Sequence, residues 1–329
     1  MKIHKFVFGV LFTISLIALT ACSSSPTPEL PTKTIAPAAA ETPEPEKKVV
    51  VGFTLQNLNN PFFVALSKGA TAGAILHNAD VITVNADGDL AKQTEQIKEF
   101  IKKKVSVILV NAVDSEGIAG AVSEARAAGI PVIAVDVEAQ GGVNTVVTSD
   151  NYLAGKLAGE YVAKRLQGKG NVVVIDGPPV SAVTERITGF KDAIHSTPGI
   201  KIVANKNGYG SREETIKVME LLLRDKGIGA IDAVFATNDP SGVGANIAVE
   251  QAGRDKHVFI VGVDGAPDAV KALMEKKSFA ATSAQYPFEM IKLAMDEGFK
   301  VLKGDKIEPL IKIPVDLITQ DNVETYKGW

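Results

Sequence analysis

The chain has 329 residues, 46% of them hydrophobic, which is enough for a globular protein of about two domains. The formal net charge is only −3 and no basic tract is present, which argues against nucleic acid as a partner. Cys22 is the only cysteine, so a disulfide framework is excluded and a thiol-based catalyst is disfavoured.

The first 48 residues indicate an export signal followed by a tether. Two lysines precede an uncharged apolar run over residues 6–21, as in a secretory signal peptide, and Leu19-Thr-Ala-Cys22 resembles a bacterial lipobox. We therefore expect a lipoprotein signal peptide at 1–21 and a lipid on Cys22, which would hold the protein outside the cytoplasm, on the periplasmic or cell surface. An uncleaved anchor is the alternative, but the apolar run is short for a spanning helix. Residues 22–48 are rich in Pro, Thr, Ala and Glu and predict a disordered linker.

From residue 49 the sequence alternates between apolar runs and amphipathic segments. Runs rich in Val and Ile without polar alternation predict buried parallel strands, and the segments between them predict helices. In the first series we expect strands at 49–54, 81–85, 105–110, 131–135 and 143–148, with helices at 62–77, 90–103 and 115–128. In the second series we expect strands at 171–175, 200–204, 231–236, 258–263 and 279–284, with helices at 152–166, 183–195, 212–225, 241–252, 266–276 and 287–303. The two similar series predict two α/β lobes whose strand ends face a common cleft.

Polar side chains follow many of these strands, at the edge where parallel α/β sheets bind ligands. In Asn59-Asn-Pro-Phe-Phe63, amides that suit hydroxyl groups stand beside aromatic faces that suit C–H groups, as a sugar ring requires. The other candidates at strand ends or helix starts are Gln56, Asp136, Arg186, Asn238, Asp264 and Gln285. Ordinary structural alternatives exist for these positions. Asn60 could cap a helix with both phenylalanines in the core, Asp136 could cap the next segment, and Asp239 or Ser241 could cap the helix near Pro240. Asp264-Gly265 could be a turn and Arg186 a solvated helix residue. Together these groups suit a neutral polyol and need no reaction.

Catalytic and cofactor motifs are missing from the sequence. It contains no Walker loop, no Gly-x-Ser-x-Gly elbow and no His-Glu-x-x-His. The four histidines have no metal-ligand spacing. We therefore expect a protein that is not an enzyme and that needs neither cofactor nor metal.

An ordered set of motifs resembles the periplasmic sugar-binding proteins of the ribose-binding type, the substrate receptors of ABC importers. The motifs are Leu58-Asn-Asn-Pro-Phe-Phe63, Ile130-Pro-Val-Ile-Ala-Val-Asp136, Ser149-Asp-Asn151, Glu185-Arg186 with Gly189-Phe190, Asn238-Asp239, Val261-Gly-Val-Asp-Gly-Ala-Pro-Asp268 and Ala284-Gln285. The resemblance covers about residues 49–320 and implies the type I periplasmic binding protein fold, an α/β fold in which two Rossmann-like lobes with parallel sheets are joined by a three-crossing hinge. The N-terminal lobe would hold 49–149 and 286–313, and the C-terminal lobe 150–285 and 314–329, with the two closing on the ligand. Trp329, the only tryptophan, is at the end of the sequence, where we expect it to report on this closure poorly.

The same resemblance implies ligand contacts and a transport function. The implied contacts are Asn60, Phe62, Phe63 and Asp136 in the first lobe, Arg186, Asn238, Asp264 and Gln285 in the second lobe and hinge, with Gln56 nearby and Tyr209 at an aromatic position. A monomer would capture a monosaccharide or cyclic polyol and deliver it to an ABC permease. The chain has Asp136-Val137 where the family commonly has Asp-Arg, and it departs from the ribose receptor at Gln56 and Val263. Without the arginine, ribose would lose a charged hydrogen bond worth about 1.5–3 kcal/mol in binding free energy. A hexose, another pentose or a cyclic polyol is therefore at least as well suited as ribose to be the ligand.

Two other functions remain open at this point. A ligand-sensing receptor for a chemoreceptor or a sensor kinase would use the same core. A lipoprotein hydrolase is disfavoured because no nucleophile and base can be assigned. Repressors of the lactose-repressor type share the core but begin with a basic helix-turn-helix, and here an export signal occupies that place.

Overall fold

The structure, a computed structural model, describes residues 48–329. The predicted signal peptide, the lipidation site Cys22 and all of the linker before Lys48 lie outside the described residues. In the part of the chain that is described, no helix combines the length and the apolar character needed to cross a membrane.

The first lobe is built on a sheet of six parallel strands in the order β11-β5-β4-β3-β1-β2. These strands are β1 (Val50–Leu55), β2 (Asp80–Asn85), β3 (Val107–Val110), β4 (Val132–Val135), β5 (Thr145–Ser149) and β11 (Leu310–Ile313). Successive side chains point to opposite faces of the sheet, and the central strands β3 and β4 are buried along their whole length, so both faces of the sheet are covered there. One face packs against α1 (Pro61–Leu76) and α9 (Pro287–Lys303), and the other against α2 (Leu90–Lys102) and α3 (Ala119–Ala127).

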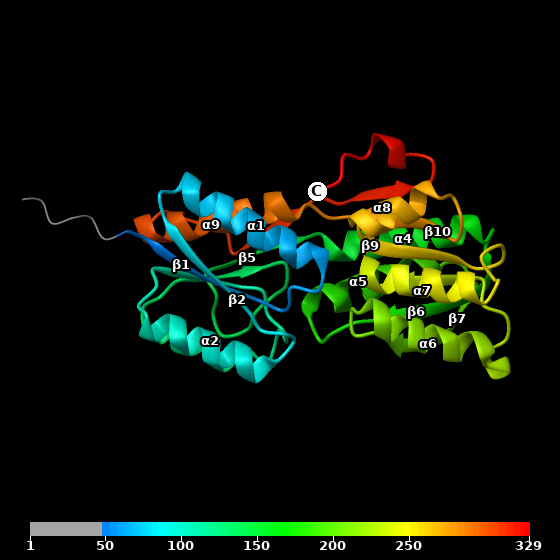
Figure 1. Cartoon of the computed structure of the whole chain (residues 1–329), viewed down its shortest axis with the longest axis horizontal. Coiled ribbons are helices and arrows are strands. Elements are labelled where there is room, and N and C mark those ends of the chain that lie inside the picture. Colours follow the sequence, from blue (N-terminus) through cyan, green and yellow to red (C-terminus); the bar gives the residue numbers. More distant parts are fainter. Residues whose placement is uncertain (1–47) are drawn as a thin grey trace, which may run out of the picture. The chain divides into compact units, whose positions relative to one another are not determined.

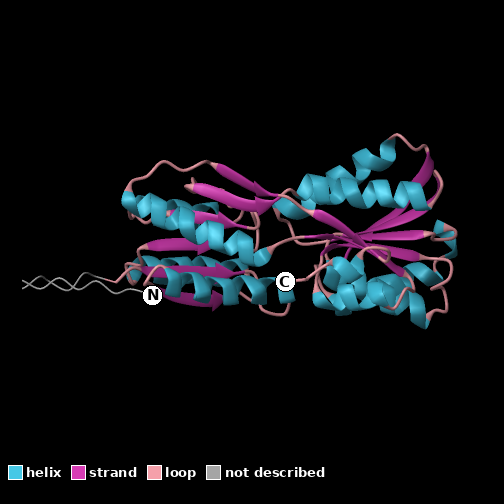
Figure 2. Ribbon diagram, turned by 90° about the horizontal axis from the view of Figure 1, so that it is seen from above, coloured by secondary structure: helices cyan, strands magenta, loops and turns pink. Residues whose placement is uncertain are grey.

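The second lobe has a sheet of six strands in the order β12-β10-β9-β8-β6-β7. Its strands are β6 (Lys169–Asp176), β7 (Gly199–Asn207), β8 (Ala233–Ala236), β9 (Phe259–Asp264), β10 (Phe279–Ala284) and β12 (Asp316–Thr319). One face packs against α4 (Asn151–Arg165) and α5 (Ser181–His195), and the other against α6 (Arg212–Arg224), α7 (Asp239–Gln251) and α8 (Pro267–Met274). Short 3₁₀ turns occur at Lys226–Ile228 and Val323–Thr325. Figure 2 shows helices on both sides of each sheet.

The predicted α/β fold with two lobes is confirmed, and each predicted helix and strand is present within a few residues. The edge strands β11 and β12 were not predicted, because each has only four residues and Pro314 interrupts the run that contains them. The sheets are mostly parallel, as expected, and the exception is the edge of the second sheet, where β12 pairs with β10 in the antiparallel direction.

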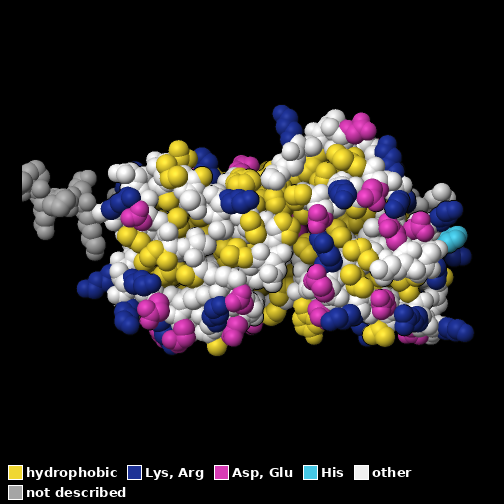
Figure 3. Space-filling model, in the orientation of Figure 1, with side chains coloured by type: hydrophobic (Ala, Val, Ile, Leu, Met, Phe, Trp, Pro, Cys, Tyr) yellow, Lys and Arg dark blue, Asp and Glu magenta, His cyan; other side chains and the backbone are white. Residues whose placement is uncertain are grey.

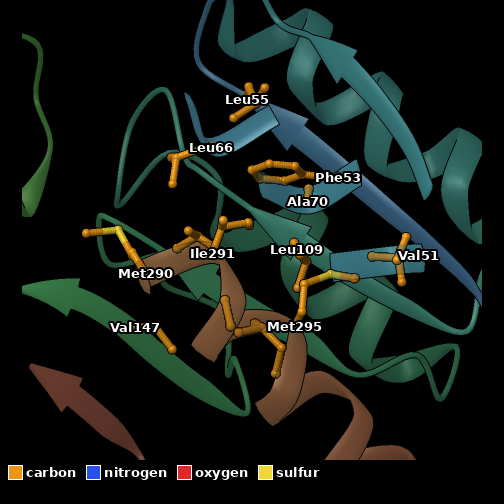
Figure 4. Close-up of a cluster of buried hydrophobic side chains, with 14 of the residues drawn as sticks. Val51, Phe53, Leu55, Leu66, Ala70, Leu109, Val147, Met290, Ile291 and Met295 are labelled. Atoms are coloured by element: carbon orange, nitrogen blue, oxygen red, sulfur yellow. The ribbon is translucent and has the colours of Figure 1, made fainter. Parts of the chain in front are cut away.

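The chain passes between the two sheets three times, after β5, after β10 and after β11. Consequently α9 comes late in the sequence but lies beside α1 in the first lobe (Figure 1). Figure 4 shows the core that joins them: Phe53 of β1 and Leu66 of α1 lie close to Ile291 of α9. This packing holds the start of α1, and with it the predicted ligand loop, against the end of the sheet.

Helices α4 and α5 cross with their backbones almost in contact. A Cβ atom on Gly155 would lie 1.8 Å from the carbonyl oxygen of Arg186, and one on Gly189 would lie 2.0 Å from that of Tyr152. Only glycine permits this approach at both positions. The crossing therefore fixes the position of α5, the helix that carries Arg186.

The two lobes also touch beside the cleft. The amide nitrogen of Ser181, at the start of α5, donates to Ser115 Oγ at 3.1 Å, and Ser181 Oγ accepts from the amide nitrogen of Glu138 at 2.8 Å. The strand ends of the first lobe are thus brought next to the helix starts of the second.

Candidate ligand-binding site

The strand ends of both lobes border a cavity whose empty space, open solvent included, is about 500 Å³. Every predicted contact except Tyr209 lines it. The lining residues are Gln56, Asn57, Asn60, Phe62, Phe63, Asp136, Val137, Pro178, Val180, Ala182, Val183, Arg186, Gly210, Thr237, Asn238, Asp264 and Gln285.

Asp136 follows β4 and presents a carboxylate with one unused oxygen. Its backbone has a φ of +71°, and Oδ2 accepts a hydrogen bond from Asn111 Nδ2 at 3.0 Å. Oδ1 is buried and has no hydrogen-bond partner among the described residues. Burial raises the pKa of the Asp136 carboxyl to about 7, although the Arg186 guanidinium opposes the rise. A donor placed in the cavity would satisfy Oδ1.

Arg186 is buried in the cavity wall, so its interpretation as a solvated helix residue is wrong. Its Nε donates to Asn151 Oδ1 at 2.8 Å and its Nη1 to the carbonyl oxygen of Thr237 at 2.8 Å. Nη1 also lies 3.7 Å from Asp264 Oδ1. These partners fix the plane of the guanidinium, and none of the hydrogen bonds within residues 48–329 uses Nη2. A guanidinium held in a fixed plane, with Nη2 available as a donor, is well suited to bind a hydroxyl group.

Asp264 is the last residue of β9, and both oxygens of its carboxylate accept hydrogen bonds from residues of the second lobe. Oδ1 accepts from Gln285 Nε2 at 2.8 Å, and Oδ2 accepts from the amide nitrogen of Asp239 at 3.2 Å. Burial raises the pKa of Asp264, while Arg186 opposes the rise. Gln285 Oε1 is a second buried acceptor in the cavity wall that has no partner within residues 48–329.

Asp239 is a buried carboxyl behind the cavity wall rather than a helix cap. Its Oδ2 accepts from the amide nitrogen of Ala266 at 2.8 Å, and its Oδ1 from Thr282 Oγ1 at 2.7 Å. Burial and the neighbouring Asp264 carboxylate raise its pKa. The cap of α7 is Asn238, whose Oδ1 accepts from the amide nitrogen of Ser241 at 3.0 Å. The expectation that Asp239 or Ser241 caps this helix is therefore wrong.

The start of α1 combines a helix cap with the cavity wall. Asn60 Oδ1 accepts from the amide nitrogen of Phe62 at 2.9 Å, so the expected cap is confirmed. Phe62 and Phe63 are both buried, with ring centroids 5.7 Å apart and an interplanar angle of 78°. They belong to the core of the first lobe and also line the cavity. Core packing and ligand contact are thus compatible for these residues.

Two substitutions of Asn60 should separate capping from ligand contact. Asn60→Ala loses the cap, which costs about 1 kcal/mol, and should also weaken ligand binding. Asn60→Asp keeps an acceptor for the cap but loses the amide donor, so we expect nearly unchanged unfolding and affinity about tenfold lower. Denaturant unfolding and calorimetry measure the two effects, with the α2 cap variant Asp89→Ala as the control for lost stability alone. If Asn60→Asp keeps full ligand affinity, Asn60 acts only as a helix cap and its amide donor does not contact the ligand.

Tyr209 lies outside the cavity. Its side chain is 68% exposed and borders a neighbouring hollow together with Arg212 and Ser211. The sequence-based placement of Tyr209 among the ligand contacts therefore finds no support in the geometry of this cavity.

Several wall and support residues were not predicted. Asn111 follows β3 directly, so the strand-end criterion applied elsewhere would have found it. Asn151 stands in the Ser149-Asp-Asn151 motif but received no role. Thr237 serves through its carbonyl oxygen, which no side-chain pattern reveals. Within residues 48–329 no group of His, Cys, Asp and Glu side chains is arranged to hold a metal ion.

Residues 51–306 match the family described as a periplasmic binding protein domain. The chain belongs to the periplasmic binding protein family. Among its relatives is the ribose import binding protein of Bacillus subtilis, 36% identical over 318 residues, which are 96% of this chain and 99% of the relative. The xylitol-binding protein of Mycolicibacterium smegmatis is 30% identical over 278 residues, 83% of this chain and 78% of the relative. The resemblance to the ribose-binding type is thereby confirmed.

Solved structures of periplasmic binding proteins share the fold. An ABC transporter solute-binding protein from Bacillus halodurans with bound myo-inositol superimposes with a TM-score of 0.80 at 29% identity, covering 85% of this chain and 97% of that one. The two-lobe architecture is therefore that of known ABC transporter solute-binding proteins.

Proposed function

We propose that this periplasmic binding protein captures a monosaccharide or cyclic polyol in the cavity and delivers it to an ABC importer. The observation that carries the proposal is the pair of buried acceptors without a partner, Asp136 Oδ1 and Gln285 Oε1, in one cavity with the Arg186 guanidinium. Buried polar atoms are normally hydrogen-bonded, and hydroxyl groups of a ligand would complete these. Relatives named for ribose and xylitol and a neighbour holding myo-inositol support the same chemical class.

A neutral ligand fits the charges of the protein. Lys and Arg are interspersed with Asp and Glu on the face shown in Figure 3, so this face has no patch of a single sign to attract a charged solute. In the cavity, the rings of Phe62 and Phe63 would cover the C–H faces of a sugar, while Asp136, Arg186 and Asn60 would bind its hydroxyl groups.

Ligand binding would favour lobe closure. We take residues 49–149 with 286–313 as one moving body and 150–285 with 314–329 as the other. Asp136 and Asn60 belong to the first body and Arg186 to the second, so a ligand gains its full set of hydrogen bonds only when the lobes are closed. Binding energy would therefore shift the population toward the closed form that a permease recognises.

The remaining parts of the proposal concern the setting of the protein. We infer that the cavity binds without reaction, because the residues that line it include no histidine, cysteine or serine. The signal peptide would direct export, and the lipid on Cys22 would then hold a monomer outside the cytoplasm, close to its permease in the membrane. Globomycin sensitivity of processing and radiolabelled palmitate incorporation into the protein, but not into Cys22→Ser, would test the anchor.

The central test is the identity of the ligand. Mass spectrometry of the small molecule released from freshly purified protein should show a sugar or polyol. Calorimetric titration with D-ribose, D-allose, xylitol, myo-inositol and common hexoses should then give binding to at least one member with 1:1 stoichiometry. If no polyol is released and no member of this panel gives heat on titration, the proposed ligand class is contradicted.

A further inference from the structure

The segment after β12 packs against the outside of the cavity wall. Trp329 Nε1 donates to the carbonyl oxygen of Asp264 at 3.0 Å, and Tyr326 Oη donates to that of Gly265 at 3.3 Å. Figure 1 shows the C-terminal end of the chain at the place where the two lobes meet. Two aromatic donors thus support consecutive peptide units of the turn that carries the Asp264 carboxylate.

This turn has a backbone conformation that side chains seldom adopt. Asp264 has a φ of +142° and Gly265 a φ of +73°. A residue with a side chain in this region carries conformational strain, which persists only where surrounding contacts hold it. The carbonyl oxygen of Asp264 accepts a second hydrogen bond, from the amide nitrogen of Gln285 at 2.9 Å. Trp329 is one of the contacts that keep the strained peptide, and hence the carboxylate, in place.

Trp329 also contacts the opposite lobe. Its ring lies edge-on to Phe62, with centroids 6.0 Å apart and an interplanar angle of 87°. This geometry is favourable for aromatic pairs. Phe62 and Asp264 both line the cavity, one from each lobe, whereas Trp329 itself does not.

We infer that Trp329 is a positioning residue for the binding site, which holds the backbone of Asp264 and the ring of Phe62 across the two lobes from outside the cavity. The inference rests on the proposed function for its meaning in ligand binding, but its structural content can be measured without a ligand. Because its indole touches both lobes, we now expect the fluorescence of Trp329 to respond to closure, in contrast to the expectation drawn from its position in the sequence.

Two variants separate the two contacts. Trp329→Phe keeps a ring beside Phe62 but removes the indole N–H, and Trp329→Ala removes both. Tyr152→Phe is the matched control, because it removes one aromatic donor, to Asp192, at an exposed position on α4. Amide hydrogen exchange of the unliganded full-length protein is followed in peptides that cover residues 264–266 and 62–64.

We expect exchange at 264–266 to accelerate about tenfold in both variants, because the turn loses a hydrogen bond. Exchange at 62–64 should accelerate in Trp329→Ala only, and the control should change neither segment. With D-ribose, xylitol and myo-inositol as probes, any bound probe should dissociate faster from Trp329→Ala than from Trp329→Phe.

Unchanged exchange at 264–266 in both variants would overturn the inference. So would equal acceleration throughout the second lobe, which would indicate ordinary packing rather than local positioning. If none of the three probes binds the unchanged protein, the exchange pattern still decides the role of Trp329. In that case it is the proposed ligand class that is in question.

Discussion

Replacing Arg186 with glutamine should lower ligand affinity at least about a hundredfold and destabilise the protein at neutral pH. The guanidinium is the only cation in the cavity wall described here, and it faces the buried carboxyls of Asp136 and Asp264. Breaking a buried ion pair by removing one partner typically costs about 3–5 kcal/mol, because the remaining charge stays desolvated. Protonation of the two carboxyls limits this cost, so the loss of stability should shrink as the pH falls to 5.

Two further variants, Arg186→Lys and Arg212→Gln, are compared with Arg186→Gln. Arg186→Lys keeps the charge but cannot reproduce the fork that binds Asn151 and the carbonyl oxygen of Thr237, so it should recover stability more than affinity. Arg212→Gln removes an arginine from an exposed pair with Asp268 and should change stability by less than about 1 kcal/mol. Thermal unfolding at pH 5 and 8 and calorimetry measure these effects. If Arg186→Gln binds the ligand with an affinity within about threefold of the unchanged protein, Arg186 is not a ligand contact.

Asp136→Asn should make the unliganded protein more stable at pH 8 while lowering ligand affinity about a hundredfold or more. Burial raises the pKa of Asp136 to about 7, against about 3.9 for an unperturbed aspartate. The folded protein thus binds this proton more tightly than the unfolded chain, so ionisation of Asp136 removes stability as the pH rises from about 4 to 7. Asparagine keeps the shape and an acceptor for Asn111 but has no charge to desolvate.

The pH dependence identifies the cause of the stabilisation. We expect Asp136→Asn and the unchanged protein to unfold alike near pH 4, and the melting temperature of the variant to be higher by about 3–6 °C at pH 8, for a gain of about 1–2 kcal/mol. We expect the gain to stay below the full effect of the pKa shift, because the proposed opening of the lobes would hydrate Asp136. Asp305→Asn, an exposed carboxylate, serves as the control. A gain of equal size at pH 4 and pH 8 would contradict an origin in ionisation.

The fold could be predicted because each element has a local cause. Gapless Val and Ile runs mark strands that are buried on both faces, and glycine, proline and cap residues mark the helix ends between them. The strand β12 lacked such a cause: its four residues follow Pro314, and its direction depends on which sheet edge the returning chain reaches. That is a property of the assembled lobes and not of the segment.

The candidate site was predictable to the extent that its residues follow strands. Asp136 and Gln285 lie directly after a strand and Asp264 is the last residue of one, and the topology of parallel sheets brings such positions together. Orientation could not be predicted in the same way. Tyr209 follows β7 at a similar position, yet its side chain points to solvent.

Trp329 shows the other limit of prediction from sequence. Its contacts with Asp264 and Phe62 join positions far apart in the chain, and no local pattern specifies such pairs. The electrostatics of the cavity likewise could not be predicted from local sequence patterns. The pKa of Asp136 depends on burial by both lobes and not on its neighbours in sequence.

The glycine crossing of α4 and α5 has a consequence for redesign of specificity. Because the backbones touch at Gly155 and Gly189, a shift of α5 toward α4 would bring the two backbones into collision, so we expect α5 to adapt little to a larger or differently shaped solute. We therefore expect changes of specificity to be accommodated by the wall that the first lobe contributes. Combinatorial libraries for biosensor engineering should therefore randomise Gln56, Asn57 and Val137 and leave the α5 wall intact. Variants that alter the crossing should be lost to misfolding before they can be screened for new ligands.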